Sequence, residues 1–201
     1  LWSRGLGDVY KRQLKYIVMP KNETWRFSHL IVPSMSNYKD GIITPHMPNW
    51  LRHLSNIPLK RQKIKPHRKI FLTRKDAENR NIKNQRELLL ALKGFETITL
   101  EELSIEEQVK AFAEATHVVA PHGAGLVNTL WCNEGTKVYE LSHEAFAYKK
   151  VYPSLSHHLG LEHTVIICDT EKLNVKKPKN KKSKDMVDLK IDIPNLIRHI
   201  D

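Results

Sequence analysis

The sequence predicts an α/β domain built on a doubly wound parallel sheet, and two observations lead to this prediction. From residue 68 onward, short apolar runs of strand character alternate with segments whose apolar side chains recur at helical spacing. The connections between these segments are short. Strands and helices that alternate in this way form a parallel sheet with right-handed crossovers and helices on both faces.

Five short apolar runs are the predicted strands of this sheet. A basic segment follows the fifth run, and after it the pattern predicts one more strand at 188–193 and a helix at 195–200. The five predicted strands are 70–73, 96–100, 117–120, 137–141 and 164–168.

Two of the intervening helices begin with capping residues. Asn84, with Glu87 three positions later, fits a capping box, and Gly94 supplies the left-handed residue that ends such a helix. Ser104 and Glu107 fit a second capping box. The predicted helices are 84–93, 105–115, 127–131 and a segment within 145–159.

The two ends of the chain lack the alternating strand and helix pattern of the middle. Asp8 to Gln13 corresponds to one translated frame of a transposase adapter used in DNA libraries, so we interpret residues 1–13 as a cloning or assembly scar outside the fold. Extended pieces at 16–19 and 29–32 and a helix-like piece at 49–54 follow. The predicted division is 1–13 scar, 14–65 remnant of an amino-terminal domain with a linker, 66–170 α/β domain, and 171–201 basic loop with a final strand and helix.

The chain of 201 residues has a formal net charge of +11, much of it in the runs 60–69 and 176–184. Such a charge favours anionic partners. The sequence has no aromatic residues interleaved with these runs and no recognisable nucleic-acid module, so we interpret them as solvated loops and expect no nucleic-acid partner. Cys132 and Cys168 are too few for a disulfide framework or a zinc site, and we expect two buried thiols.

Polar residues follow the predicted strands where a parallel sheet binds ligands, beyond the carboxyl ends. Arg74 follows the first strand, His122 follows the third and Glu140 lies at the end of the fourth. A guanidinium matches a phosphate bidentately, and Arg80 would add a second one unless it is a surface residue. A buried carboxylate at Glu140 needs a partner, which is either a ribose diol or a neighbouring Lys or Arg.

The loop after the third strand has the composition of an anion site. Gly123 and Gly125 allow positive φ and a close approach of the backbone, and the helix that follows offers unpaired amide donors. His122 would donate to a phosphate or a leaving group, or would only cap the loop. A structural tight turn is the alternative for the glycine pair. No residues at metal-ligand spacing accompany His122, so the sequence implies no metal.

Seven segments, taken in order, resemble the blocks of glycosyltransferase family 61. The resemblance spans residues 68–168, and the ordered set is far more specific than any one block. The blocks are Arg68–Arg74, Asn84–Leu89, Gly94–Glu96, Leu103–Gln108, Phe112–Ala115, Val118–Asn128 and Val138–Leu141.

The resemblance implies a two-domain GT-B enzyme that inverts the anomeric carbon, of which this chain is the Rossmann-like, donor-binding half. It implies a UDP-sugar donor such as UDP-N-acetylglucosamine or UDP-xylose, a glycan or glycoprotein acceptor, and no metal or tightly bound cofactor. The amino-terminal domain of the same protein would be a partner, and we expect the chain alone to be inactive. By position, the donor-binding residues are Arg74, Arg80, His122, Gly123, Ala124, Gly125, Leu126, Asn128 and Glu140.

One departure and two alternatives accompany this interpretation. The common Asn-Glu pair of the family reads Asn84-Gln85 here. A dinucleotide oxidoreductase is disfavoured because the turn after the first strand reads Thr73-Arg74-Lys75-Asp76 and lacks glycines. A basic nucleic-acid-binding module is the non-enzyme alternative. His46 and Asp40 are available as a general base, but the sequence assigns the role to neither.

Overall fold

The structure is a computed structural model, and the account below concerns the residues that it describes. The chain divides into two compact units, Leu1–Ser34 and Met35–Asp201. The first unit contributes only Asn22, Thr24 and Arg26, so the fold described is that of the second. The described residues are 22, 24, 26, 43–54, 65–74, 81–147, 149–172 and 187–200. The predicted extended pieces at 16–19 and 29–32, the basic run 176–184 and the first half of the basic run 60–69 lie outside them.

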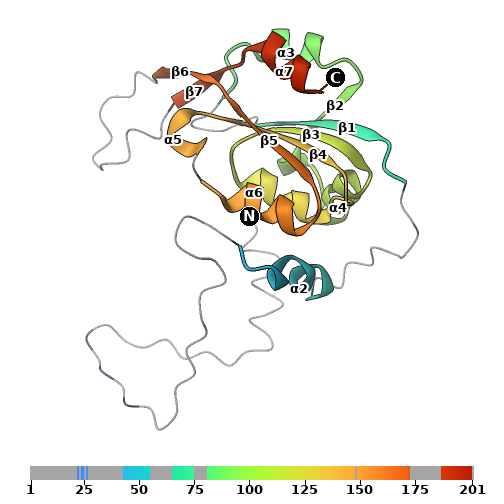
Figure 1. The fold of residues 1–201 in the computed structure, drawn as a ribbon, viewed down its shortest axis with the longest axis vertical. Coiled ribbons are helices and arrows are strands. Elements are labelled where there is room, and N and C mark those ends of the chain that lie inside the picture. Colours follow the sequence, from blue (N-terminus) through green and yellow to red (C-terminus); the bar gives the residue numbers. More distant parts are fainter. Residues whose placement is uncertain are drawn as a thin grey trace. The chain divides into compact units, whose positions relative to one another are not determined.

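A five-stranded parallel sheet forms the centre of the second unit, as predicted (Figure 1). Neighbouring strands lie in the order β2-β1-β3-β4-β5, and every pair is parallel. The predicted runs match the strands to within a few residues. The strands are β1 Arg68–Thr73, β2 Phe95–Thr99, β3 Ala115–Pro121, β4 Lys137–Ser142 and β5 Glu162–Ile167.

Helices cover both faces of the sheet, which makes it doubly wound (Figure 1). One face packs Phe71, Val119 and Leu141 against α3 (Gln85–Ala91) and α7 (Ile193–Ile200). The other face packs Ile70, Val118 and Val138 against three helices that follow in the chain. These are α4 (Ile105–Ala113), the 3₁₀ helix η3 (Ala124–Trp131) and α6 (Val151–His158).

The direction of strand addition reverses between β1 and β3. The chain passes from β1 to β2 on one side of β1 and then returns to place β3 on the other side. The loops that leave β1 and β3 therefore diverge to opposite faces, and α/β proteins with this 2-1-3-4-5 order bind ligands in the crevice between such loops. The switch point lies between Arg74 and His122, which directly follow these two strands.

A helix that precedes the sheet in sequence packs on the η3 face. This helix, α2 (His46–Leu54), includes the predicted helical piece 49–54. The guanidinium of its Arg52 donates from Nε to the carbonyl of Leu130, and a terminal nitrogen donates to the carbonyl of Cys132 over 2.7 Å. The amide of Ile43 donates to Ser154 Oγ of α6 over 3.0 Å. The last carbonyls of η3, which a helix leaves without internal donors, are thus bound by a guanidinium.

Several local predictions need correction. Asn84 precedes α3 but forms no side-chain cap, because its amide group pairs with the backbone N–H and C=O of Ile191. Gly94 does adopt a left-handed φ of 77°. The predicted helix within 145–159 is two helices, α5 (Glu144–Ala147) and α6. Helix η3 starts at Ala124, three residues before the predicted start.

A small second sheet follows β5, and half of it was not predicted. Strand β6 (Asp169–Lys172) pairs antiparallel with β7 (Val187–Lys190). Strand β7 agrees with the predicted final strand, but the sequence Asp-Thr-Glu-Lys of β6 has no apolar alternation that would indicate a strand. The carboxylate of Asp188 in β7 is buried, accepts from the Asn81 amide and lies 3.0 Å from Lys83 Nζ, which ties β7 to the start of α3.

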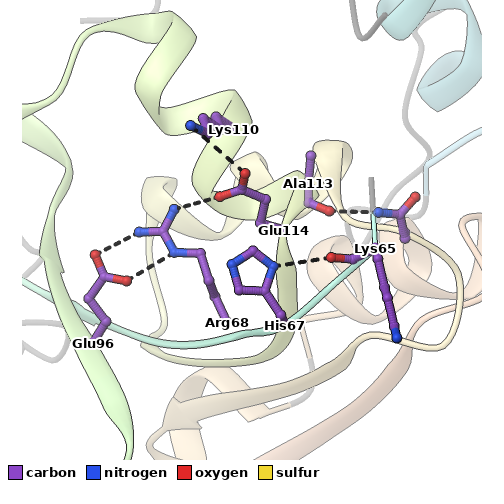
Figure 2. A network of polar contacts seen from close by, with 8 residues as sticks. Lys65, His67, Arg68, Glu96, Lys110, Ala113 and Glu114 are labelled. Atoms are coloured by element: carbon purple, nitrogen blue, oxygen red, sulfur yellow. Dashed lines mark hydrogen bonds and ion pairs between the residues drawn. The ribbon is translucent and has the colours of Figure 1, made fainter. Parts of the chain in front are cut away.

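The amino edge of the sheet, opposite the switch point, holds a network of charges (Figure 2). The guanidinium of Arg68 lies 2.6 Å from a carboxylate oxygen of Glu96 and 3.2 Å from one of Glu114. Lys110 reaches the second oxygen of Glu114 at 4.0 Å. These contacts join β1, β2 and the end of α4, so this edge has a structural role.

Both cysteines are buried free thiols, as expected. Burial raises the pKa of each thiol to about 12, so both are protonated and unreactive at neutral pH. Among the described residues, no helix combines the length and apolar character needed to cross a bilayer.

The second capping box is confirmed and gives a test of the fold. Ser104 Oγ accepts from the Glu107 amide at 3.2 Å, and the Glu107 carboxylate accepts from the Ser104 amide at 2.8 Å. Ser104→Ala should lower the free energy of unfolding by about 1 kcal/mol, whereas Ser104→Thr, which keeps the hydroxyl, should lower it far less. Urea unfolding measures both, and equal losses would contradict the capping role.

Candidate functional site

The candidate site lies at the carboxyl edge of the sheet, on the two sides of the switch point. Arg74 is the first residue after β1, and its side chain is half-buried. The loop that begins at His122 is the first segment after β3. Strands β1 and β3 are direct neighbours, so their carboxyl ends place the arginine and the loop on the same edge.

Arg74 lines a small hollow of about 10 Å³ at this edge. The residues around it come from the end of β1, the segment that leads into α3, the start of α3 and the end of β3. Two of them are hydrogen-bonded, because Gln85 Nε2 donates to Thr73 Oγ1 at 3.2 Å. Neither Gly123 nor Glu140 belongs to this hollow. Its lining residues are Thr73, Arg74, Asn81, Ile82, Gln85 and Pro121.

Neither glycine of the loop adopts a left-handed conformation, which corrects the sequence prediction, and Gly125 serves close packing instead. Gly123 is extended, with φ 166°, and Gly125 is not among the glycines of positive φ. A Cβ on Gly125 would lie 3.0 Å from Leu100 Cδ1 and 3.6 Å from Leu72 Cδ1. The absence of a side chain therefore lets η3 approach the sheet closely, and the loop amides of Gly123 and Ala124 are brought to its edge.

The rest of the predicted loop is turned into the protein. Leu126 is fully buried in the core, and Asn128 is 6% exposed, with its Nδ2 donating to Gln108 Oε1 of α4 at 3.3 Å. Gln108 in turn donates to the carbonyls of Leu100 and Leu103. Of the loop residues predicted to bind the donor, Ala124 is exposed, Gly125 is half-buried, and the others are buried.

Glu140 lies two residues before the end of β4, opposite Ala120 of β3, and not at the strand end as predicted. The residue is 1% exposed. One carboxylate oxygen accepts from Nδ1 of His122, and the other accepts from Nε2 of His163 at 2.9 Å. Its partners are thus neither the ribose nor the Lys or Arg that the sequence analysis considered, but two histidines of this chain.

Hydrogen bonds keep this buried carboxylate ionised. Burial alone would raise the pKa of Glu140, but the hydrogen bonds and the charges of His122 and His163 outweigh burial and lower that pKa below its ordinary value. Ser156 Oγ of α6 lies 2.8 Å from Nδ1 of His163, so the polar contacts continue to the helix that covers this face.

Aromatic side chains enclose the His122 ring. The ring of Phe146 in α5 is 4.9 Å away between centroids, and the ring of Tyr152 in α6 is 5.2 Å away. Lys149 Nζ lies over the ring of Phe146, 3.6 Å from its centroid, which is a cation–π contact. The side chain that opens the glycine loop is therefore held by packing as well as by Glu140.

The structure thus separates the predicted site residues into two groups. Arg74 and the backbone of Gly123 to Gly125 lie at the edge of the sheet, whereas His122 and Glu140 form a buried pair on the α6 face. Arg80 lies outside the described residues. His46 is exposed at the start of α2, and Asp40 also lies outside the described residues.

Sequence reasoning missed His163, Ser156 and the aromatic residues around His122. One signal was available, because a buried carboxylate requires a partner and His163 stands in the neighbouring apolar strand. Within the described ranges, no three His, Cys, Asp or Glu side chains are arranged to hold a metal ion.

The fold and the edge of the sheet define a Rossmann-like α/β protein with a candidate ligand site at its switch point. The model of the family described as Glycosyltransferase 61 matches residues 10–139, which is more than half of the chain. The chain belongs to glycosyltransferase family 61.

One curated relative is the protein O-linked-mannose beta-1,4-N-acetylglucosaminyltransferase 2 of Xenopus laevis. It is 30% identical over 156 residues, a match that covers 68% of this chain and 24% of the relative. The chain therefore spans about a quarter of the length of this relative.

Acid titration tests the buried carboxylate. Because the pKa of Glu140 is lower in the folded than in the unfolded chain, its contribution to stability is present above the unfolded value of about 4.3 and is lost as pH falls through the folded value. The free energy of unfolding should therefore fall on acidification below about pH 4.3, by at most about 1.4 kcal/mol per pH unit from this group.

Glu140→Gln should flatten this part of the pH dependence, as measured by urea unfolding at a series of pH values. Glu144→Gln, at an exposed carboxylate on α5, controls for the loss of one negative charge. Identical slopes in the wild-type chain and the Glu140→Gln variant would show that the carboxylate does not titrate as described.

Proposed function

We propose that this chain is the donor-binding part of an inverting glycosyltransferase of the GT-B type that uses a UDP-sugar. The proposal rests on membership of glycosyltransferase family 61 together with one structural observation. Arg74 and the loop after β3 flank the point where the strand order reverses, which is where sheets of this topology bind nucleotides.

The donor diphosphate would lie over this edge. Arg74 would bind a phosphate bidentately, and the backbone amides of Gly123, Ala124 and Gly125 would donate to the phosphate oxygens. Ala124 is exposed and Gly125 half-buried, so the accessible part of the proposed site lies at these two residues, and Gly123 is buried beside them. Arg80, which directly precedes the described Asn81 of the Arg74 hollow, is proposed as a second phosphate ligand.

In the transfer step, the bond between the anomeric carbon and the diphosphate breaks while the acceptor hydroxyl attacks from the opposite side. Negative charge develops on the departing UDP, and Arg74, His122 and the loop amides would stabilise it. These groups would supply the positive charge, so the proposal needs no metal ion. A general base must remove the proton of the acceptor hydroxyl, and we place that base in the amino-terminal domain of the whole enzyme.

The sugar and the acceptor are proposed only by class. The Xenopus relative is named for N-acetylglucosaminyl transfer to an O-linked mannose. We propose that this chain serves transfer of a hexosyl, pentosyl or N-acetylglucosaminyl group to a glycan or glycoprotein, and that it needs the rest of its enzyme for activity.

UDP binding to the chain tests the proposal. At about a hundredfold excess over its Kd, UDP should stabilise the folded chain by about 2.7 kcal/mol, a rise in Tm of about 5 °C or more for a protein of this size. Arg74→Ala should abolish the rise, and Arg74→Lys, which keeps the charge but not the bidentate geometry, should leave part of it. Differential scanning calorimetry measures all three.

Arg198→Ala is the matched control, because it removes an exposed guanidinium on α7. Its UDP-dependent rise in Tm should equal that of the wild-type chain. A folded chain that shows no rise with UDP or any UDP-sugar at millimolar concentration would overturn the donor site. Tight binding of generic DNA or RNA with a steep salt dependence would favour the nucleic-acid alternative instead.

A further inference from the structure

The segment 81–84, which leads into α3, is held by the carboxyl-terminal strand β7. The segment forms a turn and one isolated bridge, in which Ile82 pairs in parallel with Leu189. The amide of Leu189 donates to the carbonyl of Asn81 over 2.8 Å, and the carbonyl of Leu189 accepts from the amide of Lys83 over 2.9 Å. Strand β7 therefore pairs both with β6 and with the segment 81–84.

Side chains strengthen this pairing at both ends of the segment. At its start, one oxygen of Asp188 accepts from the amide of Asn81 at 3.0 Å and from its Nδ2 at 3.3 Å. The second oxygen lies 3.0 Å from Lys83 Nζ. At its end, the side-chain amide of Asn84 donates to the carbonyl of Ile191 over 2.8 Å and accepts from its N–H over 2.9 Å.

Asp188 is the charged group of this pairing. The residue is 3% exposed, whereas the side chain of Lys83 is 43% exposed, so the ion pair lies at the boundary between the core and the solvent. A buried carboxylate needs donors for its oxygens, and Asn81 and Lys83 supply them. Removal of the carboxylate would also leave the amide of Asn81 without its acceptor.

The residues that β7 holds form one wall of the hollow beside Arg74. Asn81, Ile82 and Gln85 line this hollow together with Arg74. Gln85 also donates to Thr73, which connects the wall to the residue before Arg74. The position of the wall thus depends on β7, and a ligand of Arg74 must fit beside it. Residues that hold a binding surface from behind decide how well it is preorganised.

We propose that Asp188 is a positioning residue of the donor site, which holds the segment 81–84 on β7 so that the wall beside Arg74 fits the donor diphosphate. The inference rests on the proposed function. It gives a role in donor binding to the carboxyl-terminal strand, which lies beyond the residues 10–139 matched by the family model. Because such coupling is reciprocal, a donor that binds better when the segment is in place must also stabilise the pairing of the segment with β7.

The affinity of Asp188 variants for UDP tests the role. Asp188→Ala removes the acceptor of the Asn81 amide and should raise the Kd for UDP about tenfold, a magnitude typical of residues that orient a ligand-binding group. Asp188→Asn keeps one oxygen as the acceptor, and the exposed ammonium of Lys83 can turn to solvent, so its Kd should stay close to that of the wild-type chain. Isothermal titration calorimetry well below the Tm of each variant measures these constants on folded protein.

Asp192→Ala separates positioning from stability. The exposed carboxylate of Asp192 accepts from the amide of Asn195 over 3.0 Å at the start of α7 and does not contact the segment 81–84. Its removal should lower the Tm, as the loss of a helix cap does, and should leave the Kd for UDP unchanged. An Asp188→Ala variant with a lower Tm and a wild-type Kd would match this control and would overturn the positioning role.

Hydrogen exchange of the wild-type chain is a second test, which does not depend on whether a variant folds. The amides of Asn81, Lys83 and Leu189 donate across the pairing. UDP should slow their exchange more than that of the Asn195 amide, which donates to Asp192 instead. An equal effect on all four amides, or no effect on any of them, in a chain that binds UDP would overturn the role.

The donor site and the positioning role fail in different ways. A folded wild-type chain that binds no UDP overturns the donor site on which the role rests. A wild-type chain that binds UDP, together with a folded Asp188→Ala variant that binds it equally well, overturns the role of Asp188 and leaves the donor site standing.

Discussion

A carboxylate taken out of water destabilises a protein unless its oxygens are bound by donors, and this constraint acts on Glu140. Both of its oxygens are bound, one by the residue that opens the loop after β3 and the other by a residue of the next strand. The pairing requires β3, β4 and β5 to lie side by side in the observed register. The same contacts that keep the charge in the interior also fix the start of the loop, so stability and the geometry of the candidate site depend on one group.

The second constraint is topological. Because the chain reverses its direction of strand addition after β2, the loops that leave β1 and β3 part at the carboxyl edge of the sheet. Arg74 follows β1 and the glycine loop follows β3, so the two reach the same edge of the sheet on the two sides of the switch point. The close packing of Gly125 on Leu72 and Leu100 brings η3 down onto the sheet and leaves its first amides at that edge.

The sequence predicted the sheet, the order of its elements and the residues that follow each strand, because these depend on local pattern. It predicted the contacts of side chains less well, because a polar side chain can hydrogen-bond to more than one partner. Ser104 caps its helix as predicted, but Asn84, equally suited to capping, binds the backbone of Ile191, 107 residues away. The glycine loop was located correctly and explained by the wrong property, since packing and not positive φ requires Gly125. The position of Arg74 was predicted from order alone, whereas the partners of Glu140 depended on which residue of β5 lies beside β4.

Helix α2 has a practical consequence for where the domain can be cut. Arg52 binds the carbonyls of Leu130 and Cys132 at the end of η3, and Ile43 pairs with Ser154 and His158 of α6. A shortened protein that begins at β1 would lose these hydrogen bonds to the two helices and would remove Ile43 from the core cluster to which Trp131 and Leu155 belong. Crystallisation or labelling work on the sheet domain should therefore retain residues from 43 onward, even though they precede the first strand by some two dozen positions.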